Sequence, residues 1–145
     1  YWKRTIAPPA MTSFDASSRE SCIVRQTRTN TPLQALNLMN DVTYLEASRK
    51  LAERMLKEGG SAEDDRIAYA FRLVVSRHPK AEEAKVLRDS LHGFMGRYQN
   101  DSKAALKYLN YGDSDRDEHL NPNELASYAA VASLILNLDE TITKE

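Results

Sequence analysis

Helical periodicity runs through most of this 145-residue chain, and no segment alternates between apolar and polar residues as a strand does. The first helix follows Thr31, a residue that can cap it, and begins at Pro32, whose missing N–H is not needed in the first turn. Further apolar stripes follow, separated by helix stops such as Gly59-Gly60 and Pro79. We expect helices from Pro32 to Asn40, from Asp41 to Gly59, from Ser61 to residue 78, and over residues 80–98, 102–110 and 121–138. This pattern predicts an all-α fold, an irregular bundle of five or six helices.

The first 30 residues lack this periodicity. They contain Pro8, Pro9 and several serines and threonines, so we predict an extended arm over residues 1–30 that precedes a helical bundle over residues 31–145. With 41% hydrophobic residues, a chain of this length can bury roughly two-thirds of its extended-chain surface. We therefore expect residues 1–145 to form a single helical domain.

Charge and cysteine content exclude several classes of function. The net charge is −1, which argues against a general nucleic-acid binder, because such proteins carry a strongly basic face. No apolar run approaches the ~20 residues that a membrane-spanning helix needs. The single cysteine, Cys22, excludes an internal disulfide, a multi-cysteine metal site and a Cys-x-x-Cys-His haem attachment, so any haem would lie outside these residues.

An acidic segment near the C-terminus is the clearest chemical signal. Residues 111–124 carry five acidic side chains and one basic side chain. Within this segment, residues 113–124 match the calcium loop of an EF-hand at positions 1, 3, 5, 8 and 12, and helices are expected on both sides. The candidate calcium ligands are Asp113, Asp115, Asp117, His119 and Glu124.

Three features depart from the EF-hand pattern. Position 6 is Glu118 where the turn calls for glycine, Gly112 stands where the entering helix should still pack, and no second EF-hand is present to pair with. In the alternative interpretation, Gly112 ends one helix, Ser114 and Asp117 cap the turn, and Glu124 caps the next helix. The acidic side chains then simply face solvent, and the sequence favours this capped turn over calcium.

Arg25, Arg28 and Asn30 form a second candidate site. They precede the helix that begins at Pro32, whose unpaired N–H groups and dipole favour anions. Such a corner can hold a sulfate, a phosphate or a carboxylate from a neighbouring domain. The alternative, which the sequence favours, is that the arginines hold the arm against the bundle through acidic or carbonyl partners.

No catalytic or zinc-binding residue is predicted. His78, His92 and His119 show no ligand spacing such as His-x-x-x-His. The carboxylates Asp139 and Glu140 have no base, nucleophile or oxyanion donor placed beside them by the sequence, so surface or capping roles are expected.

One run is specific enough to indicate a family: Arg28-Thr29-Asn30-Thr31-Pro32-Leu33-Gln34-Ala35-Leu36, followed by Asn40-Asp41. With Tyr1-Trp2-Lys3-Arg4-Thr5 before it and Ala70-Phe71-Arg72 after it, the chain resembles a planctomycete-specific C-terminal domain of unknown function. The closing segment is similar to that of the same family at Gly112, Glu124-Leu125-Ala126 and Asn137-Leu138-Asp139-Glu140.

The resemblance implies a setting but no activity. Such domains form the C-terminal part of large exported proteins, which often carry a cytochrome-c-like domain near the N-terminus. The resemblance therefore implies a location in the periplasm or at the cell surface. It also implies that more of the domain precedes Tyr1, so that the chain is a C-terminal fragment.

We therefore expect a non-catalytic structural or binding module that packs against the preceding domains of the same polypeptide. The family's setting suggests an acidic or sulfated glycan as a further partner. Two alternatives stay open. Arg25, Arg28 and Asn30 could complete an enzyme active site that forms with the upstream region, or residues 113–124 could make the chain a calcium-stabilised, EF-hand-like module.

Overall fold

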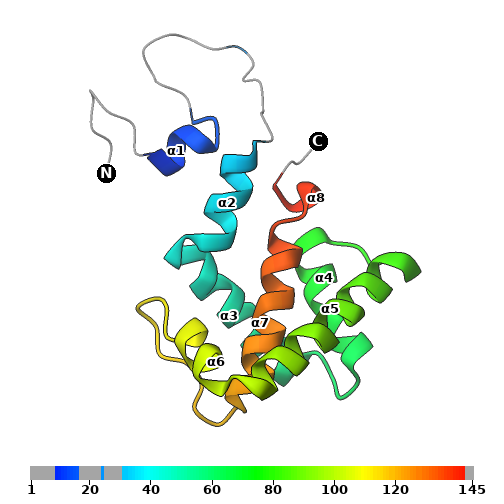
Figure 1. The fold of residues 1–145 in the computed structure, drawn as a ribbon. Coiled ribbons are helices and arrows are strands. Elements are labelled where there is room, and N and C mark those ends of the chain that lie inside the picture. The colour runs from blue at the N-terminus through cyan, green and yellow to red at the C-terminus, as the bar shows by residue number, and fades with distance from the viewer. Residues whose placement is uncertain (1–8, 17–23, 25–30, 143–145) are drawn as a thin grey trace.

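α7 (Pro122–Leu136) runs through the middle of the molecule, and the other long helices lie around it (Figure 1). Nine of its 15 residues are buried, because its sequence is apolar on nearly every side. α3 (Val42–Glu58), α5 (Ala81–Asn100) and α6 (Ser102–Leu109) pack directly on it, and α4 (Glu63–Val75) packs beside α3 and α5. The position of α7 makes it the element that joins the others into one core.

The computed structural model describes residues 9–16, 24 and 31–142. Every regular element in these ranges is a helix, so the all-α prediction is confirmed. The remaining helices are α1 (Pro9–Ser13), α2 (Pro32–Asn40) and α8 (Asp139–Ile142). α2 to α7 correspond to the six expected helices, whereas α1 and α8 are additional. α1 lies within the predicted extended arm, and a helix this short has too few residues to show a periodic pattern.

Local capping explains where several helices begin. Thr31 and Gln34 form a capping box on α2, because the N–H of Thr31 donates to Gln34 Oε1 (3.1 Å) and the N–H of Gln34 donates to Thr31 Oγ1 (3.3 Å). Asp41 caps α3 by accepting from the N–H of Thr43 (2.9 Å). Asn121 caps α7 by accepting from two N–H groups of its first turn (2.9 and 3.3 Å). These three caps confirm the helix starts read from the sequence.

The hydrophobic core lies between α3, α4, α5, α6 and α7. Its largest fully buried side chains are Tyr128, Phe71, Met55, Ile67, Leu91, Leu109, Leu125 and Ile135. Within the ranges that the structure describes, no helix combines the length and the apolar character needed to cross a membrane.

Candidate functional site

The acidic loop between α6 and α7, residues 110–121, lies against a charged face of α3. Side chains three, four and seven residues apart share one side of a helix, so α3 carries a row of charges of both signs there. The side chains that meet the loop are Glu46, Arg49, Lys50, Glu53 and Lys57. We refer to these five residues as the loop clamp.

Arg49 is the centre of the loop clamp. The residue is only 3% exposed, and its guanidinium donates to the carbonyl oxygens of Leu109, Tyr111 (3.1 Å) and Ser114, and to the Ser114 hydroxyl (2.9 Å). The guanidinium thus faces several converging oxygens, as a bound cation does in a calcium loop. Its Nε is buried with no hydrogen-bond partner among the described residues, which costs about 1–3 kcal/mol.

Glu46 holds the other side of the loop backbone. Its carboxylate accepts from the N–H groups of Asp113 (3.0 Å) and Ser114 (3.1 Å). Hydrogen bonds from Ser114 and Asp113 keep the pKa of Glu46 below its usual value. Gly112 allows this close approach, because its φ is +100° and a Cβ at this position would collide with the Glu46 carboxylate. The glycine that departs from the EF-hand pattern is therefore required by the contact with α3.

The five predicted calcium ligands do not converge on one point. Asp117 forms an ion pair with Lys57, and the hydrogen bond from that ammonium group lowers the pKa of the carboxyl. Glu124 pairs with Arg66 (3.0 Å). In the described ranges, no group of three or more His, Cys, Asp or Glu side chains is placed to hold a metal ion. The geometry gives no support to calcium binding, which stays a prediction for Asp113, Asp115, Asp117, His119 and Glu124.

The predicted anion site cannot be placed in the same way, because Arg25, Arg28 and Asn30 lie outside the described residues. The helix start expected beside them is described. There the N–H of Gln34 already donates to Thr31 Oγ1 (3.3 Å). Anion binding at this corner stays a prediction.

α2 presents an apolar face to solvent. Leu33 is 55% exposed, Leu36 56%, Met39 45% and Val42, the first residue of α3, 49%. α2 has no charged residue, and its buried side chains are those of Leu38 and one glutamine. We call Leu33, Leu36, Met39 and Val42 the α2 face. The sequence did not reveal it, because apolar residues at helical spacing ordinarily belong to a core. The absence of charge on a nine-residue helix was the available signal.

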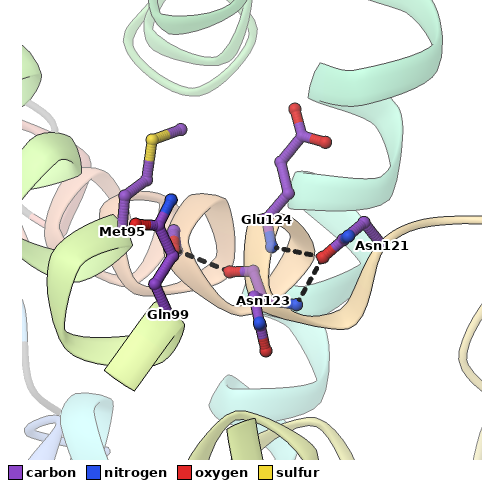
Figure 2. A pocket seen from close by; sticks show the side chains of 6 residues that line it. Met95, Gln99, Asn121, Asn123 and Glu124 are labelled. Carbon is purple, nitrogen blue, oxygen red and sulfur yellow. Dashed lines mark hydrogen bonds between the residues drawn. The ribbon is translucent and has the colours of Figure 1, made fainter. Parts of the chain in front are cut away.

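A small polar pocket lies between the end of α5 and the start of α7 (Figure 2). Its volume is about 270 Å³, and it is lined by Met95, Gln99, Asn121, Asn123, Glu124 and Ser127. Several of its polar side chains already have partners: Asn121 caps α7, the Ser127 hydroxyl donates to the Asn123 carbonyl (2.7 Å), and Glu124 pairs with Arg66. The pocket therefore contains no nucleophile paired with a base.

Ion pairs, rather than burial in a cleft, account for the strongest carboxyl pKa shift in the described chain. Arg77 donates to Glu83 (2.8 Å) and Glu140 (2.7 Å), and its guanidinium lies 4.9 Å from the centre of the Phe71 ring. The hydrogen bonds from Arg77 lower the pKa of Glu83 to about 2. This cluster joins the end of α4 to α5 and α8, and Glu140 has the surface role expected from the sequence.

Comparison with known proteins gives one match. The sequence model of the family described as PSD1, protein of unknown function (DUF1553), matches residues 1–91. No curated protein and no solved structure matches the chain. The match includes α1 to α4 and the first half of α5, whereas α6, α7 and the acidic loop lie beyond it.

Proposed function

The chain belongs to the PSD1 family of proteins of unknown function, and we propose that it is a non-catalytic docking module that binds another part of the same protein through the α2 face. The exposure of the α2 face carries this proposal. Neighbouring exposed apolar side chains, here three on α2 and one at the start of α3, are typical of interaction sites, whereas single exposed ones are ordinary. A partner that covers Leu33, Leu36, Met39 and Val42 removes about half of each side chain from water, worth on the order of 1 kcal/mol each.

The ionisable groups of the described chain support the non-catalytic part of the proposal. Arg77 with Glu83 and Glu140, and Lys57 with Asp117, are ion pairs between helices or between a helix and the loop. The pKa shifts of their carboxyl groups come first from these pairs. An acid or base tuned for catalysis would instead stand in a cleft beside a reacting group.

The setting of the docking module rests on the resemblance alone. We propose that the partner is the region preceding Tyr1 in a large exported planctomycete protein, located in the periplasm or at the cell surface. A cytochrome-c-like domain, and with it any haem, would belong to that region. An acidic or sulfated glycan at Arg25, Arg28 and Asn30, or a composite enzyme site completed by these residues, remains a proposal that no described residue favours.

The docking proposal is tested by mixing residues 1–145 with the separately expressed preceding region of the same gene product and measuring association by calorimetry. We expect binding by the wild type and a large loss in Leu33→Ser with Leu36→Ser. The matched control is Leu73→Ser with Val86→Ser, two exposed apolar residues on α4 and α5 (46% and 63% exposed). Absence of binding, or equal binding by both double variants, would refute docking through α2.

Calcium is tested by the thermal melt in chelator and in millimolar calcium. A ligand that binds only the folded state stabilises it, by about 2.7 kcal/mol when its concentration is a hundredfold above the dissociation constant. The melting temperature rises accordingly. Because Lys57 and Arg66 already pair with Asp117 and Glu124, we expect no shift. A rise of several degrees that disappears in Asp113→Ala would establish the calcium-stabilised module instead.

A further inference from the structure

α6 and the loop that follows it carry unpaired charges of opposite sign. Lys103 and Lys107 are exposed on α6, and Asp113, Asp115 and Glu118 are exposed on the loop. Within residues 31–142, none of these five side chains takes part in an ion pair. Asp117 of the same loop, in contrast, is paired with Lys57. Among the described residues, these two adjacent groups of charges thus have no ion-pair partner.

Two exposed apolar side chains accompany these charges. Leu106 is 37% exposed and Tyr111 is 40% exposed. They line a shallow hollow of about 540 Å³ together with the two lysines and Asn110. Asn110 also lines a second hollow, of about 500 Å³, along the loop, so the two hollows are neighbours on one surface. We call Lys103, Leu106, Lys107, Tyr111, Asp115 and Glu118 the α6–loop face.

The loop clamp fixes the acidic half of this face. Arg49 holds the carbonyl oxygens of Tyr111 and Ser114, and the Lys50 ammonium donates to the carbonyl oxygen of Asp115 (2.6 Å). These contacts use the loop backbone and leave the Asp115 carboxylate free. A charged surface on a backbone that is already ordered loses little conformational freedom when it binds, which favours association.

We propose that the α6–loop face is a contact between two copies of this chain. In a two-fold arrangement the lysines of each copy meet the acidic loop of the other, with Leu106 and Tyr111 near the axis. A two-fold contact uses the same patch twice and therefore needs a patch that is complementary to itself, as a face with both signs of charge is.

The charge pattern favours a second copy over other partners. A polyanion would be attracted by Lys103 and Lys107 but repelled by Asp115 and Glu118, and a polycation would meet the reverse problem. An uncharged partner would remove both groups of charges from water without pairing them, which is costly. A second copy supplies both signs at matching positions.

The α6–loop face has six residues, against about 20–30 on each side of a standard interface, so we expect the dimer to be weak and sensitive to salt. Interfaces that bury less than about 1,200 Å² in total are typical of transient complexes. Exposed ion pairs are screened when the ionic strength rises, because the Debye length falls from about 10 Å at 0.1 M to 3 Å at 1 M. We therefore expect a dimer that forms at high protein concentration in low salt and dissociates in high salt.

Sedimentation equilibrium on residues 1–145 tests this with two charge-reversal variants. The first is Lys103→Glu with Lys107→Glu, and the second is Asp115→Lys with Glu118→Lys. Each variant alone repels itself, so we expect its self-association to be at least about tenfold weaker than that of the wild type. An equal mixture of the two variants has complementary charges at both halves of the contact, and we expect it to dimerise at least as tightly as the wild type.

A control separates a specific contact from general attraction between oppositely charged proteins. Lys85→Glu with Arg97→Glu places the same charge change on exposed positions of α5. This control should dimerise like the wild type by itself. Mixed with the Asp115→Lys, Glu118→Lys variant, it should associate less tightly than the complementary mixture does. Thermal melts check that every variant is folded.

Three results would overturn the proposal. The first is a wild type that stays monomeric at about millimolar concentration in low salt. The second is a control mixture that associates as tightly as the complementary mixture, which would show non-specific attraction. The third is a dimer that survives both charge reversals and disappears in Leu33→Ser with Leu36→Ser, which would assign self-association to the α2 face.

Discussion

Replacing Arg49 with methionine should destabilise the fold strongly, because methionine keeps much of the side-chain volume and removes every hydrogen bond to the loop. The guanidinium makes contacts with Leu109, Tyr111 and Ser114, and each bond from a charged donor contributes about 1.5–3 kcal/mol. The simple sum overstates the loss. Tyr111 and Ser114 are partly exposed, so their carbonyl oxygens can regain water.

The Leu109 carbonyl accounts for most of the stability that Arg49→Met is expected to lose. Leu109 is 0% exposed, so its oxygen stays unpaired in Arg49→Met at a cost of about 1–3 kcal/mol. Loss of the charged bonds to the partly exposed groups adds to this, and removal of the unpaired Nε subtracts about 1 kcal/mol. We expect a net loss of about 3 kcal/mol, at the lower end of the range for breaking a buried charge interaction. The melting temperature should then fall by about 6–12 °C.

Urea unfolding at pH 7, followed by circular dichroism, measures this change. The matched control is Arg97→Met, an exposed arginine on α5, which should stay within about 0.5 kcal/mol of the wild type. Arg49→Lys keeps the charge but not the planar fork, so it should lie between the two. If Arg49→Met and Arg97→Met unfold at the same urea concentration, the loop does not depend on Arg49 and the reasoning above is refuted.

Three further predictions follow from the packing. Gly112→Ala should lower the free energy of unfolding by about 1–3 kcal/mol in the same urea assay, because it puts a Cβ at a positive φ and against the Glu46 carboxylate. An unchanged urea midpoint would contradict the close contact between Gly112 and α3. The pKa of Glu83 is lowered to about 2 by its hydrogen bonds with Arg77, so this contribution to stability is present above the unfolded carboxyl pKa and is lost as the pH falls toward 2. The urea midpoint of the wild type should therefore fall more steeply between about pH 5 and 2 than that of Arg77→Met, and parallel curves would contradict the pairing. Residues 1–91 alone should show no cooperative thermal transition, because α7 is missing, and a cooperative transition would show that the matched segment folds by itself.

The starts of α2, α3 and α7 could be predicted from sequence because their cause is local. Thr31, Asp41 and Asn121 cap helices by bonding residues two or three positions away. The burial of α7 could also be predicted, since a helix with so little polar surface must be buried. α1 and α8 were not, because one helical turn leaves no periodic pattern.

The organisation of the acidic loop could not be read from the loop itself. Its spacing matches that of a calcium site, but the charges that hold it come from α3, 60 to 65 residues earlier in the case of Arg49. An arginine at helical spacing among other charged residues ordinarily faces solvent. The available signals were the row of charges of both signs from Glu46 to Lys57 and an acidic segment that lacks the EF-hand glycine. Only the tertiary fold shows that the two meet.

An internal guanidinium and a bound metal ion place different demands on such a loop. A calcium ion draws carboxylates inward, because they are its ligands. Arg49 is held chiefly by carbonyl oxygens of the loop, so the carboxylates of Asp115 and Glu118 stay outside and free. We therefore expect the loop to be ordered without a bound metal ion, with its acidic surface available for a partner.

The same contact ties together the two halves of the chain. Arg49 belongs to the segment that the family model matches, whereas the loop and α7 lie beyond it. One side of α3 packs on α7, and another side holds the loop. A change in the matched segment therefore alters the packing of the segment beyond it, and the reverse also holds. A substitution in the loop clamp should therefore affect the α6–loop face before it affects the α2 face, because the side chains of the loop clamp bond to the loop and to the end of α6 rather than to α2. Self-association and docking can accordingly be separated by mutation, and an Arg49 variant that loses the first while keeping the second would show that the two surfaces act independently.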